Sequence, residues 1–218
     1  AAPGAQLVQL GQAELVGAVD DDGVGGRHVD AVLDDGAGDQ QVEAARVEFA
    51  HRALHLARRH LAVGDADAVL FAAGAGPGSG AYRKWTVDRD GAIKLINACK
   101  KNGINRYLII SAMGLDKPRG NEVFRTYLKA KAEADEAVRK SGLDYTIVKP
   151  GRLTDEPGTE QVSVGTDLDR GDIPREDVAS VLAELFERPE TSGLEFDLVS
   201  GDTPLDEAID ALAGESAG

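Results

Sequence analysis

Tyr127 and Lys131 are the residues of this chain whose types and spacing best suit acid–base chemistry. Residues four apart on a helix lie on one face, so the two side chains would point the same way. A nearby ammonium favours a phenolate, which predicts a lowered pKa for the Tyr127 phenol and equips it for proton transfer. Ala134 and Val138 continue this face, and a lysine on a buried stripe is costly unless it reaches a cleft or a partner. The alternative is a lysine that extends along the helix to solvent.

Ser111 is a second candidate, because it ends the apolar segment 106–111. In a parallel sheet, ligands bind beyond the carboxyl ends of the strands. A hydroxyl at this position could polarise a substrate carbonyl. On local grounds it could equally cap the loop that follows.

Two further segments follow apolar runs and are candidates for cofactor binding. The segment from Ala73 through Gly74 and Gly76 to Gly80 is rich in glycine, which would let a dinucleotide approach the backbone closely. A flexible surface loop is the alternative. Pro150-Gly151-Arg152 follows another apolar run, and Arg152 could bind a phosphate or carboxylate, or else be a solvated surface arginine.

The elements that must position these residues alternate along the chain. Continuous apolar runs predict strands, and segments with helical spacing or caps separate them. We expect strands at 68–73, 106–111, 144–149 and 194–199, and helices at 86–102, 122–141, 175–188 and 204–212. Such alternation predicts an α/β fold, a Rossmann-like doubly wound parallel sheet with helices on both faces.

The ordered set of motifs from about residue 65 to 212 resembles the atypical short-chain dehydrogenase/reductase family, NAD(P)-binding Rossmann proteins with flavin-reductase-like and NmrA-like members. The segments that carry the resemblance are Asp67–Gly74, Val87–Ala92, Tyr107–Gly114, Tyr127–Lys131 and Ser141–Gly151. The resemblance implies NADP or NAD as the cofactor.

The same resemblance implies roles for individual residues. Tyr127 would be the proton donor, Lys131 would bind the nicotinamide ribose, and Ser111 would orient the substrate. The cofactor would be lined by Ala73, Gly74, Gly76, Pro150, Gly151 and Arg152.

Composition limits the partners and the compartment. The formal net charge of −14 argues against nucleic acid, because binding of phosphates needs a basic surface. No apolar run approaches the length of a membrane span, and no secretory signal is seen at the start. A single cysteine, Cys99, fits a reducing compartment. We therefore expect an acidic cytoplasmic protein with a small-molecule substrate and no membrane partner, and the sequence leaves a homodimer open.

Residues 1–64 differ in composition from residues 65–218, which we interpret as the remainder of a single NAD(P)-binding Rossmann domain. They contain no Lys, Ile, Ser, Thr, Asn, Tyr, Trp, Cys or Met. Nearly all their residue types have codons that begin with G or C, as in an antisense reading of a GC-rich gene. We interpret this head as an antisense or chimeric reading in the place of the first β-α-β-α-β unit. A natural segment rich in Ala, Gly, Val and Asp is the alternative.

The head also lacks the phosphate-binding loop that the resemblance implies. Gly23–His28 does not have the Gly-x-x-Gly-x-x-Gly spacing, and Asp20–Asp22 before it would repel a phosphate. All four histidines lie in the head. No cysteine and no histidine–glutamate motif accompanies them with ligand spacing, so we predict no metal site.

Three hypotheses follow. The first is an NAD(P)-dependent oxidoreductase, or an epimerase- or dehydratase-like enzyme, acting on a small carbonyl or hydroxyl substrate. The second is a non-catalytic NAD(P)-binding sensor that acts through a partner. The third is an inactive chimera, which predicts poor folding with exposed apolar strand edges.

Overall fold

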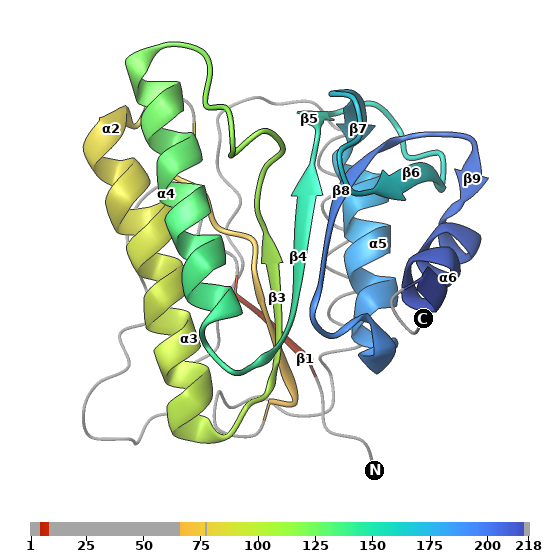
Figure 1. Ribbon diagram of the computed structural model, residues 1–218, viewed down its shortest axis with the longest axis horizontal. Helices are drawn as coiled ribbons and strands as arrows, with labels where there is room; N and C mark the ends of the chain where they lie inside the picture. The colour runs from red at the N-terminus through yellow and green to blue at the C-terminus, as the bar shows by residue number, and fades with distance from the viewer. Residues whose placement is uncertain (1–4, 9–65, 77, 216–218) are drawn as a thin grey trace.

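The computed structural model describes residues 5–8, 66–76 and 78–215, and a largely parallel sheet lies at its centre (Figure 1). The parallel strands lie in the order β1 (Ala5–Val8), β2 (Ala68–Phe71), β3 (Arg106–Ile110), β4 (Asp144–Pro150) and β8 (Leu194–Ser200). Two antiparallel strands, β6 (Gln161–Gly165) and β9 (Thr203–Pro204), extend the sheet beyond β8. All four residues of β2 are buried, as expected for a parallel strand covered on both faces.

The helices begin and end at residues that suit their positions. A continuous helical segment runs through α2 (Gly80–Arg83), the π-helical turn η2 (Lys84–Arg89) and α3 (Asp90–Asn102). Gly103 ends it in the left-handed conformation, with φ 70°. The helix α4 (Glu122–Arg139) begins after Asn121, whose side chain accepts a hydrogen bond from the Phe124 amide. The remaining helices are α5 (Arg175–Phe186), a 3₁₀ turn η3 (Pro189–Thr191) and α6 (Leu205–Glu215).

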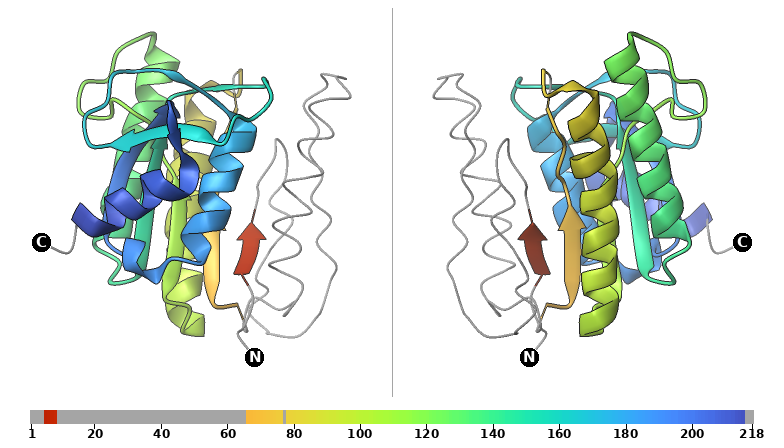
Figure 2. Two further views of the ribbon diagram at one scale, coloured as in Figure 1. Left: turned by 90° about the vertical axis from the view of Figure 1, so that its right-hand side faces the viewer. Right: turned by 90° about the vertical axis from the view of Figure 1, so that its left-hand side faces the viewer.

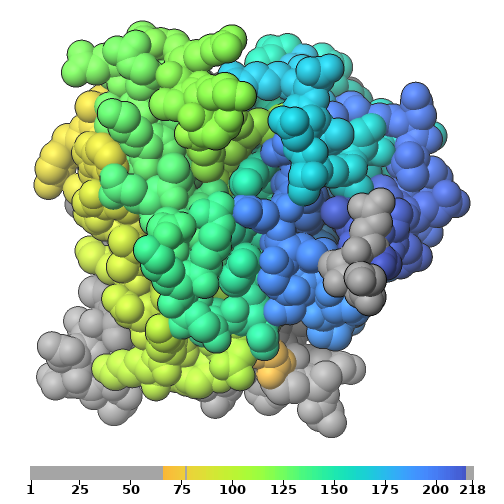
Figure 3. All heavy atoms as spheres, in the orientation of Figure 1, coloured from red at the N-terminus to blue at the C-terminus, as the bar shows by residue number. Residues whose placement is uncertain are grey.

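Alternate residues of each central strand bury on opposite faces of the sheet. Phe71 of β2 and Ile109 of β3 belong to the core beneath α3 and α4, which also contains Ile96 and Val138. The neighbouring residues, including Leu70 and Leu108, belong to the core beneath α5 and α6. The two side views show these helical layers in turn (Figure 2). Residues of α4 and of the loop before it cover much of the face drawn in the space-filling view (Figure 3).

The prediction of an α/β, doubly wound Rossmann-like sheet with helices on both faces is confirmed. Three details differ from expectation. The first long helical segment begins at Gly80, six residues before the predicted start. Residues 151–174 contain β6 and a separate two-stranded parallel sheet of β5 (Arg152–Thr154) and β7 (Asp172–Pro174), none of which was predicted. Thr203–Pro204 forms β9 and is not part of the last helix.

The interpretation of residues 1–64 as an anomalous head stays a prediction. Only Ala5–Val8 of that segment is described, and it pairs in parallel with β2 from Ala5↔Ala68 to Val8↔Phe71. The four histidines and Gly23–His28 lie outside the described residues. Within the described ranges, no helix is long and apolar enough to cross a membrane, and no group of three or more His, Cys, Asp and Glu side chains could hold a metal ion.

Candidate active site

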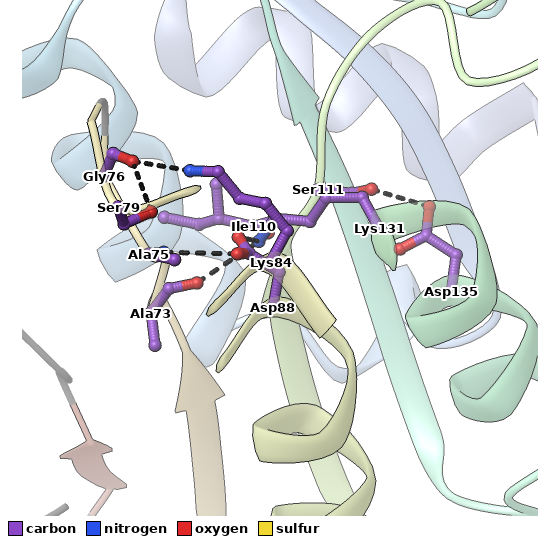
Figure 4. Close-up of polar contacts among 10 residues, drawn as sticks. All are labelled: Ala73, Ala75, Gly76, Ser79, Lys84, Asp88, Ile110, Ser111, Lys131 and Asp135. Atoms are coloured by element: carbon purple, nitrogen blue, oxygen red, sulfur yellow. Dashed lines mark hydrogen bonds and ion pairs between the residues drawn. The ribbon is translucent and has the colours of Figure 1, made fainter. Parts of the chain in front are cut away.

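The carboxyl ends of β2, β3 and β4 lie side by side, because these three strands are parallel neighbours. Each is followed by one of the segments singled out in the sequence. At this edge the Lys131 ammonium, from α4, donates a 2.8 Å hydrogen bond to the Ile110 carbonyl oxygen and a 3.3 Å hydrogen bond to that of Ala73 (Figure 4). Lys131 therefore joins the ends of β2 and β3.

Asp88 is the charged partner of Lys131. Its Oδ1 lies 3.8 Å from Lys131 Nζ, and the side chains are 0% and 4% exposed. Asp88 Oδ2 accepts a 3.2 Å hydrogen bond from the Ala75 amide (Figure 4). Burial is the main cause that raises the pKa of Asp88 and lowers that of Lys131, and the attraction between the two charges opposes both shifts.

Ser111 is bound to a second buried carboxylate. Its hydroxyl donates a 2.6 Å hydrogen bond to Asp135 Oδ2, and both residues are buried (Figure 4). Burial raises the pKa of Asp135 to about 6, against the opposing effect of this hydrogen bond.

Tyr127 lies half-buried on α4, close to the same charges. Lys84 Nζ lies 5.6 Å from the centroid of its ring, and the Phe124 ring is 5.7 Å away, centroid to centroid. The prediction that Lys131 lowers the pKa of the Tyr127 phenol is wrong. Burial raises that pKa, and the negative charges of Asp88 and Asp135 raise it further. The Lys131 ammonium is held instead by backbone carbonyls and Asp88.

The glycine-rich segment after β2 is tied to the helical segment that follows it. Lys84 is buried and donates a 2.5 Å hydrogen bond from Nζ to the Gly76 carbonyl oxygen (Figure 4). Gly76 has a φ of 62°, in the left-handed region that favours glycine. A Cβ on Gly74 would lie 3.4 Å from Asp88 Oδ1, so the backbone passes close to this carboxylate.

In the segment after β4, the backbone at Gly151 passes very close to the backbone at Gly171. Pro150 is buried, and a Cβ on Gly151 would lie only 2.1 Å from the Gly171 carbonyl oxygen. Arg152 is exposed, and its Nε donates a 2.8 Å hydrogen bond to Asp172 Oδ1, with a second contact between Nη2 and Oδ2. To bind a cofactor phosphate, the Arg152 guanidinium would have to leave Asp172.

The structure thus brings Ala73, Ser111 and Lys131 together and places Tyr127 near the same charges, whereas Arg152 lies in the small second sheet. Sequence reasoning missed three charged residues of this cluster: Lys84, Asp88 and Asp135. All three had a visible signal. Asp135 follows Lys131 by four residues on the stripe begun by Tyr127, and Lys84 and Asp88 are also four apart.

The chemistry of this edge suits a ligand that carries hydroxyl groups. Among the described residues, Asp88 Oδ1 and Asp135 Oδ1 are buried oxygens without a hydrogen-bond partner. A buried acceptor of this kind is normally satisfied, and a ribose hydroxyl is a donor of matching chemistry.

Comparisons with known proteins identify the family. A family model described as NAD(P)H-binding matches residues 21–189, so the match begins within the first 64 residues. The chain is 42% identical over 147 residues to YhfK of Bacillus subtilis, which is named as an uncharacterized sugar epimerase. The match covers 67% of this chain and 69% of YhfK. It is 41% identical over 155 residues to the yeast protein YMR090W of Saccharomyces cerevisiae, covering 67% of this chain and 68% of the relative.

Two solved structures are also similar. One is a candidate NAD-dependent epimerase/dehydratase from Bacillus halodurans, with a TM-score of 0.65, 41% identity and coverage of 67% of this chain and 70% of the other. The second is the oxidoreductase ylbE from Lactococcus lactis, with a TM-score of 0.62, 29% identity and 68% coverage of each chain. The chain therefore belongs to the NAD(P)H-binding family of Rossmann-fold proteins, and its cofactor is NAD or NADP.

Proposed function

We propose that the chain is an NAD(P)-dependent oxidoreductase, or an epimerase- or dehydratase-like enzyme, that acts on a small carbonyl or hydroxyl substrate. The names of the similar proteins support a reaction of this class. The observation that carries the proposal is the cluster at the carboxyl ends of β2 and β3, where Tyr127, Lys131 and Ser111 lie with two buried carboxylates. Such a concentration of perturbed groups at this edge of an α/β sheet is typical of an active site.

The proposed roles follow from what each residue does in the structure. Lys131 positions the ends of β2 and β3 through two carbonyls and presents its charge at the edge of the sheet, where the ribose would bind. Ser111 would contact the substrate oxygen. NADH or NADPH supplies hydride chemistry when bound. Around it we place Ala73, Gly74, Gly76, Pro150, Gly151 and Arg152.

The raised pKa of Tyr127 indicates in which direction the reaction would run. A phenol that stays protonated at neutral pH is ready to donate a proton to a substrate oxygen that becomes basic, as a carbonyl oxygen does during reduction. It is poorly prepared to remove a proton from an alcohol. The arrangement therefore favours reduction of a carbonyl, with Tyr127 as the proton donor.

The same observation favours a second candidate function, a non-catalytic NAD(P)-binding sensor. An enzyme of the predicted kind would use Lys131 to lower the pKa of the phenol, whereas Lys131 is here engaged with backbone oxygens and Asp88. A protein that only senses the redox state of the cofactor needs the binding edge and not an activated tyrosine.

One experiment separates the two functions. Binding of NADH and NADPH is measured by the change in nicotinamide fluorescence, and cofactor oxidation is then followed with a panel of aldehydes, ketones, quinones, flavins and nucleotide sugars. Turnover of a panel member supports the enzyme. Tight binding of one cofactor with no turnover across the panel supports the sensor, and no binding of either cofactor contradicts both.

The proposal also covers the cellular location of the protein and its partners. We propose a cytoplasmic location, because the single cysteine, Cys99, is a buried free thiol. We further propose that the partners are small molecules and not nucleic acid, in keeping with the net charge of −14. Light scattering after size-exclusion chromatography distinguishes a monomer from the homodimer that the sequence left open.

A further inference from the structure

The Ser111 hydroxyl has one proton, and the geometry assigns this proton to a hydrogen bond with Asp135. Ser111 is fixed by its backbone, since its amide donates a 2.7 Å hydrogen bond to the Val148 carbonyl oxygen. Its Oγ donates to Asp135 Oδ2 at 2.6 Å. An ionised carboxylate accepts hydrogen bonds and cannot donate one. While Asp135 is ionised, Ser111 can therefore offer only lone pairs to a ligand, and it cannot donate to a carbonyl oxygen.

The cations that face Asp135 come from two elements. Lys131 and Arg139 lie on α4 with it, and Lys149 approaches from β4. Arg139 and Lys149 are each ion-paired with Glu195 of β8, which reduces their effect on Asp135. Lys131 is ion-paired with Asp88, so its charge acts on both carboxylates. Asp135 Oδ1 is buried and has no hydrogen-bond partner within the described part of the chain.

We propose that Asp135 is a positioning residue that sets the direction of the Ser111 hydrogen bond and so decides whether Ser111 accepts from a substrate hydroxyl or donates to a substrate carbonyl. The proposal deepens the proposed function, on which it rests. When Asp135 takes up a proton from solvent, its new O–H group can donate to Ser111 Oγ. The Ser111 proton is then released from Asp135 and can turn towards a substrate carbonyl. No covalent bond changes apart from this one protonation.

The pH range of this change is close to neutral. Burial raises the pKa of Asp135 to about 6, so the donor form of Ser111 would dominate below pH 6 and the acceptor form above it. Tyr127 stays protonated across this range, because its own pKa is raised. A change in activity near pH 6 can therefore be traced to Asp135 and not to the proton donor.

The first test needs no substrate. The side-chain carboxyl carbon of Asp135 is followed by ¹³C NMR from pH 4 to 8 in the full chain, with Asp135→Asn used to assign the signal. We expect an inflection near pH 6.

Ser111→Ala should move the inflection to higher pH, because the hydrogen bond that favours the carboxylate is lost. Glu136→Gln, which removes an exposed carboxylate beside Asp135, should leave the inflection unchanged. Titration below pH 4.5, or no shift in Ser111→Ala, overturns the proposal. Should Ser111→Ala not fold, Ser111→Cys substitutes a weaker donor and should give a smaller rise.

The second test uses a substrate found in the panel described above. We expect kcat/KM for carbonyl reduction to fall by about tenfold for each pH unit above 6, as the protonated fraction of Asp135 falls. In Asp135→Asn this inflection should vanish, because an amide group can donate to Ser111 at every pH. Glu136→Gln should keep it. An unchanged inflection in Asp135→Asn overturns the proposal. Titration of Asp135 without turnover of any substrate contradicts the proposed function and leaves the Ser111–Asp135 relationship intact.

Discussion

Lys131 and Asp88 face each other across 3.8 Å at the edge of the sheet, and both side chains are almost fully buried. They come from different helical segments, α4 and η2, so the pair joins the two helices as well as the strand ends that Lys131 contacts. A pair of buried charges at this position is a poor choice for stability alone, since apolar residues of the same volume would be at least as stabilising. We therefore propose that the pair serves cofactor binding at this edge of the sheet.

Removal of either member of this pair should cost stability, and the two losses should not add. Lys131→Met removes the ion-pair partner of the buried Asp88, which keeps only the weaker attraction of Lys84, and leaves the carbonyls of Ala73 and Ile110 without their donor. We expect the free energy of unfolding, measured by urea denaturation, to fall by about 3–5 kcal/mol. The double variant Lys131→Met/Asp88→Asn should lose less than the sum of the two single variants, because neither charge is then stranded.

Lys140→Met is the matched control for the lysine. Lys140 follows the last residue of α4 as its C-cap, has a side chain that is 74% exposed and pairs with Glu136. An exposed pair of this kind contributes at most about 1 kcal/mol, so the control should unfold nearly as the parent does. Equal losses of unfolding free energy in Lys131→Met and Lys140→Met would show that the buried pair contributes no more to stability than an exposed one.

The close approach of Gly151 to Gly171 predicts a second result. A Cβ at position 151 would lie 2.1 Å from a backbone oxygen, which cannot rotate away. Gly151→Ala should therefore destabilise the protein by about 1–3 kcal/mol and weaken NADPH binding by displacing the segment after β4. Gly214→Ala is the control, because that glycine lies in α6 with nothing within 4 Å of its would-be Cβ. It should stabilise the protein by up to about 1 kcal/mol. Equal effects of the two substitutions would contradict the argument.

Much of the fold was predictable because its central strands are continuous apolar runs. Residues 151–174 were not, since β5 and β7 are three residues long and contain arginine, aspartate and proline. Such strands exist through partners distant in the sequence, as β6 does through its pairing with β8. The start of the first helical segment at Gly80 was hidden by a glycine-rich run that favours a loop.

The candidate site was predictable where its residues share one helix and not where they come from two. The spacing of Tyr127 and Lys131 placed both on one face of α4, as the structure has them. It could not show that Asp88, from the π-helical turn η2, would meet Lys131 and thereby change the charge around the phenol. The expectation of a lowered pKa for Tyr127 failed because burial raises that pKa, and the carboxylates of Asp88 and Asp135 raise it further.

The proton-donor role of Tyr127 is tested by the loss of one hydroxyl. Tyr127→Phe keeps the ring that lies beside Phe124 and near Lys84, so the free energy of unfolding should change by less than about 1 kcal/mol. Removal of a general acid should lower kcat for carbonyl reduction by about 10²–10⁴-fold. Tyr82→Phe makes the same chemical change on a side chain that is 77% exposed, and it should leave kcat unaltered. Full turnover in Tyr127→Phe would exclude this mechanism.

The raised pKa of Asp135 predicts how stability depends on pH. Its ordinary value is 3.8 and its value in the folded protein is about 6, so between these pH values the folded state holds a proton that the unfolded state has released. Asp135 therefore contributes stability that is fully present below pH 3.8 and is lost as the pH rises through 6. The difference of about 2 pH units corresponds to about 3 kcal/mol.

Comparison with Asp135→Asn isolates this contribution from those of the other acidic groups, including Asp88, whose raised pKa is common to both proteins. Relative to Asp135→Asn, the parent should lose about 2.4 kcal/mol of unfolding free energy between pH 4 and pH 7 in urea titrations. Above pH 7 the difference should be constant, because Asp135 is then ionised in both the folded and the unfolded state. A difference that grew in the parent's favour as the pH rose would mean that the folded protein lowers the pKa of Asp135. Ser111 and the nearby cations would then outweigh burial, and Ser111 would remain a hydrogen-bond acceptor throughout the physiological range.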